Sequence, residues 1–346
     1  MNIGQARAAA KEWVHLHASS TAGFAGAYYS GSTVGKADEE ELPAASDVDI
    51  VIVVAMEQPP MKPGKFRYRD VLLEATYLSA SQLASPDRVL ASYHLAGSFR
   101  TNTVIADPTG GLRKLQAEVA RRFTAYDTVR QRCQEAHDRV HNGLLAIDTE
   151  APLHDLATSW LFPTGIMAHI PLVAALRNPT VRLRYAAARE TLADYGCDAL
   201  YGKLLEQLGC ADWSLDQTLR HVRQLERVFD AAAAAAKTPF FFSSDITESA
   251  KPIAVDGSLA LIHAGLHREA VFWIAATFAR CHKILAADAD PTLQEAHLPA
   301  FRELLADLGF KDRSSFVTRA RQTLMLLPEL WDAAETMLRT NPDIRR

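Results

Sequence analysis

The stretch that decides the fold reads Ser46-Asp47-Val48-Asp49-Ile50-Val51-Ile52-Val53-Val54. Its β-branched run predicts a buried strand. Side chains at i and i+2 point to the same face of a strand, so Asp47 and Asp49 share one face while the hydrophobic residues beside them turn toward the core. Two neighbouring carboxylates repel each other by ~1 kcal/mol or more unless a cation lies between them. A cation site is therefore expected at the start of this strand.

Two further features point to the same place. Gly31 and Ser32 form a turn upstream, and such a turn offers backbone N–H groups and a hydroxyl to a phosphate. Glu74 is the lone charge in the apolar run 71–78, which predicts another strand. If that strand pairs beside the Asp47 strand, Glu74 faces both aspartates; otherwise it is an edge-strand glutamate facing water. Together these residues indicate a site for a metal-bound nucleoside triphosphate.

The order of predicted elements indicates an α+β fold. An amphipathic helix is expected over residues 3–19, and helices fill the chain after Gly111. We therefore expect a mixed-sheet domain over 1–111 and a helical domain over 112–346, which could divide again at a loop near 238–257. Strands are expected at Phe24–Tyr29, Asp47–Val54, within Arg67–Ser79, and at Thr103–Ala106.

Composition excludes several classes of protein. The chain has 346 residues, a net charge of -4 and a pI of about 6.3, which disfavours non-specific binding to nucleic acid. It lacks a signal-peptide pattern and a run of the ~20 apolar residues that a bilayer-spanning helix needs, so no membrane partner is expected. Its four cysteines are scattered, which predicts neither disulfides nor zinc and favours a reducing cytoplasm. Apolar faces on the predicted helices leave a homodimer open.

The combination of Gly31-Ser32, Asp47-Val48-Asp49 and the later strand acid Glu74 resembles the DNA-polymerase-β-type nucleotidyltransferase superfamily. The sequence is most similar to its small-molecule branch, the kanamycin-type aminoglycoside nucleotidyltransferases and their uncharacterised relatives. The resemblance covers about residues 10–200 and is densest from 28 to 78. An Asp-x-Asp pair alone would be weak evidence, because calcium loops and glycosyltransferases also contain one.

The resemblance implies a nucleotidyltransferase domain and a role for each motif residue. Ser32 and the backbone of Gly31 would hold the triphosphate of the co-substrate, for which ATP is the expected nucleotide. Asp47 and Asp49 would bind two Mg²⁺ ions, and Glu74 would complete the ion on the acceptor side. The enzyme would transfer a nucleoside monophosphate to a hydroxyl of a small-molecule acceptor, with aminoglycoside-like acceptors included.

The general base departs from the family pattern. Kanamycin-type enzymes use a glutamate on the first long helix after the strands, and that position falls near His141 here. A histidine, with its ordinary pKa of about 6.5, can serve as a base. Alternatively, His137 and His141 form a polar surface face of a helix. Two other functions stay open: nucleotidylation of a protein or tRNA acceptor, and nucleotide binding without catalysis.

Basic residues offer a second set of candidates. Lys62, Lys65, Arg67 and Arg69 precede the Glu74 strand. They could attract phosphate, or they could lie on an exposed hairpin. Arg182 and Arg184, farther along the chain, could reach triphosphate oxygens or could lie in the solvated start of a helix.

Overall fold

The computed structural model describes residues 1–178 and 180–346, and the chain divides into two compact units. The first unit comprises Met1–Arg132, Phe241–Asp245 and Asp343–Arg346; the second comprises Cys133–Phe240 and Ile246–Pro342. The division falls within helix α4 (Tyr126–Leu145). The change from strands to helices, where the sequence places the boundary, occurs earlier, at α3 (Gly111–Arg122). The predicted α+β class is confirmed, because the strands belong to the first unit and the second unit is helical.

Within the described residues, the first unit holds a five-stranded mixed sheet with the order β3-β4-β2-β1-β5. Strands β2 and β4 run parallel, and the other neighbouring strands are antiparallel. The strands expected near residues 24, 47 and 103 are confirmed, each with one of its two bounds shifted by one residue. The strands are β1 (Phe24–Ser30), β2 (Val48–Val54), β3 (Gly64–Tyr68), β4 (Val71–Ser79) and β5 (Val104–Ala106).

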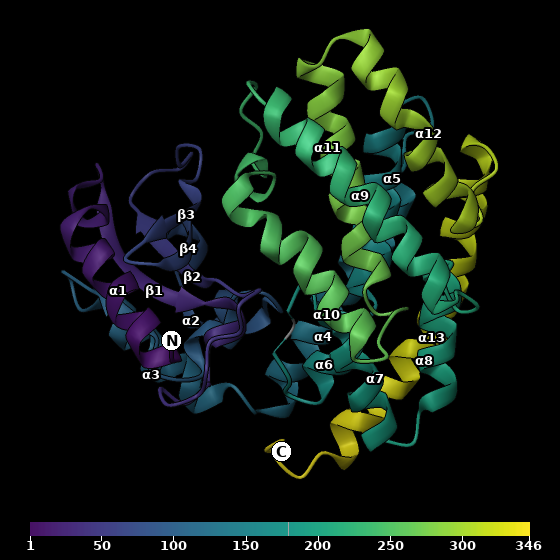
Figure 1. The fold of residues 1–346 in the computed structure, drawn as a ribbon. Coiled ribbons are helices and arrows are strands. Elements are labelled where there is room, and N and C mark those ends of the chain that lie inside the picture. The colour runs from purple at the N-terminus through teal and green to yellow at the C-terminus, as the bar shows by residue number, and fades with distance from the viewer. Residues whose placement is uncertain (179) are drawn as a thin grey trace. The chain divides into compact units, whose positions relative to one another are not determined.

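Helices cover both faces of this sheet (Figure 1). Helix α1 (Ile3–Leu16) packs on one face, where the fully buried Ile50 and Ile52 of β2 join its alanines in one hydrophobic cluster. Helices α2 (Pro86–Ala91) and α3 pack on the other face, in a cluster that includes Val53. Because side chains alternate along β2, Asp49 lies on the α2 and α3 face, at the end of the strand where the hydrophobic cluster stops.

The second unit is built from helices alone within the described residues. Helix α11 lies in its core: Phe272, Ile274 and Phe278 are 0% exposed, and the helix packs against α5, α9 and α12. The helices that follow α4 are α5 (Leu153–Ile166), α6 (His169–Ala174), α7 (Arg184–Asp194), α8 (Asp198–Leu208), α9 (Leu215–Ala235), α10 (Gly257–His263), α11 (Val271–Asp288), α12 (Pro291–Asp307) and α13 (Arg313–Thr340).

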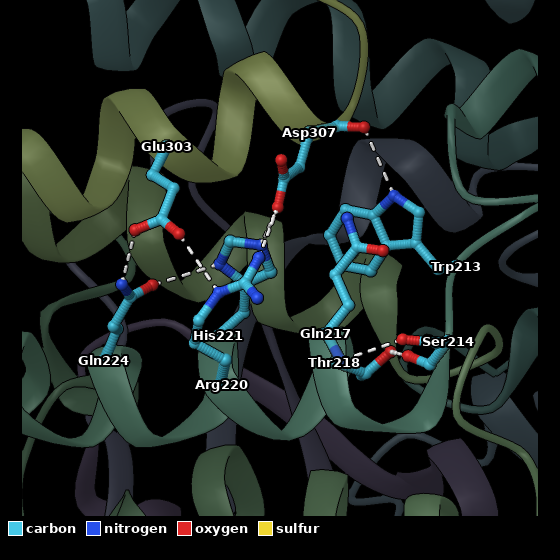
Figure 2. Close-up of polar contacts among 9 residues, drawn as sticks. All are labelled: Trp213, Ser214, Gln217, Thr218, Arg220, His221, Gln224, Glu303 and Asp307. Carbon is cyan, nitrogen blue, oxygen red and sulfur yellow. Dashed lines mark hydrogen bonds and ion pairs between the residues drawn. The ribbon is translucent and has the colours of Figure 1, made fainter.

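Polar side chains lock α9 to α12 (Figure 2). The fully buried imidazole of His221 lies 2.8 Å from the carboxylate of Asp307 and 3.1 Å from the side-chain oxygen of Gln224. Arg220, one residue earlier on α9, pairs with Glu303 at 3.0 Å and with Asp307 at 2.9 Å. Because His221 is shielded from water, its bond to Asp307 is the one in this network that contributes most to stability.

One stretch of the described residues, Leu153–Ala174, is long and apolar enough to cross a membrane by length and composition, with a mean hydropathy of 1.3. It spans α5 and α6, and 78% of the apolar 18-residue window within it is buried inside the protein. Trp160, for example, is 0% exposed and stacks edge-on against Phe310. This degree of burial is typical of a core helix.

Candidate metal centre

The register of the sheet places polar residues of four neighbouring strands in a row. Asp49 of β2 lies opposite Glu74 of the parallel strand β4. Glu74 in turn lies opposite Lys65 of the antiparallel strand β3, and Ser30 of β1 lies opposite Asp49 on the other side. Paired residues point to the same face of a sheet. The four side chains therefore form a polar row across neighbouring strands, next to the hydrophobic face.

The three predicted acids meet at this row. Asp47, Asp49 and Glu74 each offer a carboxylate oxygen, and these oxygens all lie within 4.8 Å of one another. The exposed fractions of the Asp47 and Glu74 side chains are only 13% and 17%. Glu74 is therefore not an edge-strand residue facing water, because β3 covers it on one side and β2 on the other. That the three acids bind a cation stays a prediction.

Gly31 makes room for Asp49. It begins a short 3₁₀ turn (Gly31–Thr33) with a φ of +69°, in the left-handed region that glycine tolerates best. A Cβ atom on Gly31 would overlap the carboxylate of Asp49. The turn that holds Gly31 and Ser32 is thus in direct contact with the acids, as the sequence predicts. Its role in binding phosphate is a prediction that the geometry leaves in place.

Two lysines hold the acids together. The ammonium of Lys65 forms ion pairs with Asp47 and Glu74, and the ammonium of Lys62 forms one with Glu74. The exposed fractions of the Lys65 and Lys62 side chains are 7% and 11%. The interpretation of both lysines as part of an exposed hairpin is therefore wrong, although it holds for Arg67 and Arg69. Both lysine side chains are long enough for their ammonium groups to reach the nearest buried carboxylates.

The lysines leave one acid uncompensated. Burial and the neighbouring Asp47 and Glu74 charges raise the pKa of Asp49 well above its usual range. Burial acts in the same direction on Glu74, but the charges and hydrogen bonds of Lys65 and Lys62 outweigh it and hold its pKa at about 2. Among the described residues, no ion pair reaches Asp49. The site therefore has room for additional positive charge at Asp49.

A fourth carboxylate comes from far along the chain. Residues Phe241–Asp245, called the docked segment below, belong to the first unit. Asp245 ends a short 3₁₀ turn (Ser243–Asp245); its side chain is 11% exposed and lies 3.6 Å from the ammonium of Lys65. The sequence predicts only a loop here. No local pattern marks Asp245, because its partner Lys65 lies 180 positions earlier in the chain.

The remaining sequence candidates lie in the second unit. His141 is exposed on α4, where it stacks on His137 at 6.5 Å and lies 3.3 Å from the amide oxygen of Asn142. These contacts fit the polar helix face, and a role for His141 as general base stays a prediction. Arg184 is 3% exposed, and its guanidinium lies 4.1 Å from the centre of the Phe272 ring. It packs in the core, so a solvated helix start at this residue is wrong.

The donor set fits a hard divalent cation. Carboxylate oxygens are the ligands of Mg²⁺, Mn²⁺ and Ca²⁺, whereas zinc prefers the nitrogen and sulfur ligands that this cluster lacks among the described residues. The two ammonium groups already occupy the positions where positive charge is favourable. No protein-family model matches this chain, and no curated protein matches it either. A function must therefore be argued from the site itself.

Proposed function

We propose that this protein is a divalent-cation-dependent nucleotidyltransferase that acts on a hydroxyl of a small-molecule acceptor. The observation that carries the proposal is the convergence of Asp47, Asp49 and Glu74 on one sheet face, beside the glycine turn at Gly31-Ser32. Asp47 and Asp49 would hold two Mg²⁺ ions, and Glu74 would complete one of them. When bound, such ions neutralise the phosphates and lower the pKa of the attacking hydroxyl.

The turn supplies what a triphosphate needs. Gly31 has a φ of +69°, in the left-handed region, and turns of this kind direct backbone N–H groups toward an anion. Ser32 adds a hydroxyl one residue later. Because Gly31 touches Asp49, a phosphate at the turn and a cation at the acids would be neighbours. This juxtaposition supports a nucleotide site over an isolated acidic cluster.

The proposed reaction balances without a further reactant. The acceptor oxygen forms a bond to the α-phosphorus of the nucleoside triphosphate, and the bond from that phosphorus to the α,β-bridging oxygen breaks. Pyrophosphate leaves, and the hydroxyl proton passes to a general base. The product is a phosphodiester of the acceptor and the nucleoside. ATP is the expected donor, and the polar site reads its phosphates rather than its base.

Transfer of label from ATP tests the proposal. The purified protein is incubated with Mg²⁺, [α-³²P]ATP and a panel of hydroxylated small molecules, with aminoglycosides and sugar alcohols included. We expect labelled small-molecule products. Asp49→Asn should lower the rate by more than about 100-fold, because even residues that only orient metal ligands contribute 10- to 100-fold. Asp70→Asn removes the same charge at the exposed β3–β4 turn and should leave the rate unchanged.

Three outcomes would contradict the proposal. Full transfer by the Asp49→Asn variant would exclude the acids as the metal centre. Label that appears in a protein or RNA band of a cell lysate, and not in small molecules, would change the class of acceptor. Calorimetric binding of ATP without turnover over the whole panel would reduce the protein to a nucleotide-binding module.

A further inference from the structure

Lys65 is the hub of the charged cluster. Its ammonium pairs with Asp47 of the β2 entry, with Glu74 of β4 and with Asp245 of the docked segment. With a side chain only 7% exposed, it has little water to replace any of these partners. A buried ammonium of this kind is stable only while carboxylates surround it. Whatever removes Asp47 and Glu74 from Lys65 must therefore leave it another acid.

The docked segment is held in place by the same strand that carries Lys65. Ser244 packs directly on Gly64, where a Cβ atom would overlap its side chain. The ammonium of Lys62 lies 5.2 Å from the centre of the Phe241 ring, within the range of a cation–π contact. Phe242, the next residue of the segment, is buried, with 8% of its surface exposed. The contacts of Ser244 and Phe241 therefore hold Asp245 in place beside Lys65.

A divalent cation would compete with the ammonium of Lys65 for the carboxylates of Asp47 and Glu74. A divalent cation at Asp47, Asp49 and Glu74 would seek the carboxylate oxygens that Lys65 now holds, and a cation and an ammonium repel each other at such distances. We propose that Lys65 is a built-in counter-ion that the cation must displace, and that Asp245 is the positioning residue that receives Lys65 when the cation binds. This inference rests on the metal centre of the proposed function.

The two residues then act in opposite directions on cation binding. Lys65 weakens it, because its bonds to Asp47 and Glu74 must break first. Asp245 strengthens it, because it remains the counter-charge of Lys65 after those bonds are lost. Without Asp245, the displaced ammonium would be left buried and unpaired in the cation-bound state, while in the cation-free state it would still have two acids. The effect of Asp245 must therefore pass through Lys65.

Binding of Mn²⁺ alone, measured by the loss of its free electron paramagnetic resonance signal, tests both roles. We expect Lys65→Gln to bind Mn²⁺ about tenfold or more tightly than the natural sequence, since no ammonium has to leave. Arg67→Gln removes the same charge two residues along the same strand face, where the side chain is exposed, and should change nothing. Lys65→Arg keeps the charge and should not tighten binding.

A double-mutant cycle isolates Asp245. Asp245→Asn should weaken Mn²⁺ binding at least about threefold more in the natural sequence than in the Lys65→Gln background. An equal or larger effect in that background would mean that Asp245 attracts the cation directly, and it would overturn the positioning role. The double variant keeps the net charge of the site, so it carries the test if Lys65→Gln does not fold: it should bind Mn²⁺ more tightly than Asp245→Asn alone.

The outcomes separate this inference from the proposed function. Mn²⁺ binding that is the same in the natural sequence and in Lys65→Gln overturns the competition and leaves the metal centre standing. Failure of every variant to bind Mn²⁺ overturns both. Binding by Lys65→Gln where the natural sequence shows none supports the competition. Absence of nucleotidyl transfer, with the expected Mn²⁺ affinities, overturns the proposed function alone.

Discussion

Replacing Asp49 by asparagine should stabilise the metal-free protein while it abolishes the effect of metal. Asp49 lies close to Asp47 and Glu74 without an ion pair among the described residues, so its negative charge destabilises the folded protein. Asparagine has nearly the same shape and no charge. The prediction is unusual, because most substitutions of partly buried residues destabilise a protein.

The magnitude follows from the spacing of the three carboxylates. At the 4.8 Å that bounds their separation, and with an effective dielectric of ~20, each neighbour repels Asp49 by at least about 3.5 kcal/mol. Lys65 and Lys62 neutralise those neighbours and offset most of the repulsion. We expect a remainder of about 1–2 kcal/mol, which raises the melting temperature of a unit of this size by about 2–6 °C.

The pH dependence has a definite sign. The folded-state pKa of Asp49 is raised by burial and by its acidic neighbours, so its stabilising contribution is complete below the unfolded-state pKa of about 3.9 and is lost as the pH rises through the folded value. Glu74 behaves in the opposite way: with a pKa of about 2, it stabilises the fold above about pH 4.3, and this is lost as the pH falls toward 2. Asp49→Asn should therefore remove only the loss of stability at higher pH and leave the loss toward pH 2 unchanged.

Thermal unfolding in EDTA and in Mn²⁺, followed by circular dichroism from pH 4 to 8, measures the change in stability, its pH dependence at Asp49 and the effect of the metal. The matched comparison is Glu74→Gln, which makes the same chemical change one strand away but leaves Lys62 and Lys65 short of a partner. That variant should lose about 3 kcal/mol. A melting temperature of Asp49→Asn below that of the natural sequence in EDTA, or one still raised by Mn²⁺, would refute the reasoning.

Three further predictions concern single positions. Gly31→Ala forces a side chain into the left-handed region and into the Asp49 carboxylate, so we expect a loss of about 1–3 kcal/mol by thermal unfolding together with much weaker Mn²⁺ binding; loss of stability without loss of binding would contradict the contact. In the second unit, hydrogen bonds, chiefly from His221, outweigh burial and lower the pKa of Asp307. The contribution of Asp307 to stability is therefore present above about pH 4 and is lost below it. Asp307→Asn should cost about 1–3 kcal/mol by urea unfolding at pH 7 and much less at pH 3. Burial holds the pKa of His282 at about 3, and its Nε2 has no hydrogen-bond partner among the described residues. Stability should therefore fall as the pH drops below about 6.5, and His282→Phe should reduce that fall in a pH series of melting temperatures.

The acids could be predicted because their signal is local. Alternation along one strand places Asp47 and Asp49 on the same face, and a lone charge in an apolar strand places Glu74 beside a partner. The parallel pairing of β2 with β4 is not itself visible in the sequence. The sequence predicts only that Glu74 faces both aspartates if the two strands are neighbours, and the register that sets Asp49 opposite Glu74 meets that condition.

The lysines could not be predicted because the hairpin that carries them has an atypical turn. Arg69 and Asp70 both adopt positive φ values, 47° and 65°, which is the geometry of a two-residue type I′ turn. Such turns are usually marked by Asn-Gly or Gly-Gly, and Arg-Asp gives no such signal. The sequence therefore predicts one strand within 67–79, whereas the structure has two strands over 64–79, and the register that brings Lys65 opposite Glu74 stays hidden.

A purely structural account of the charged cluster explains some of its residues and not others. Lys62 and Lys65 neutralise Asp47 and Glu74, and a closed network of this kind could exist only to join three strands and the docked segment. Asp49 has no place in such a network, since asparagine would fill the same space without the repulsion. The left-handed glycine turn that accommodates its carboxylate has none either. A fold that retains both the repulsion and the left-handed turn is compensated only when positive charge reaches Asp49 from outside the chain. The residues that structure alone leaves unexplained are therefore the ones that a cation and its phosphate would use.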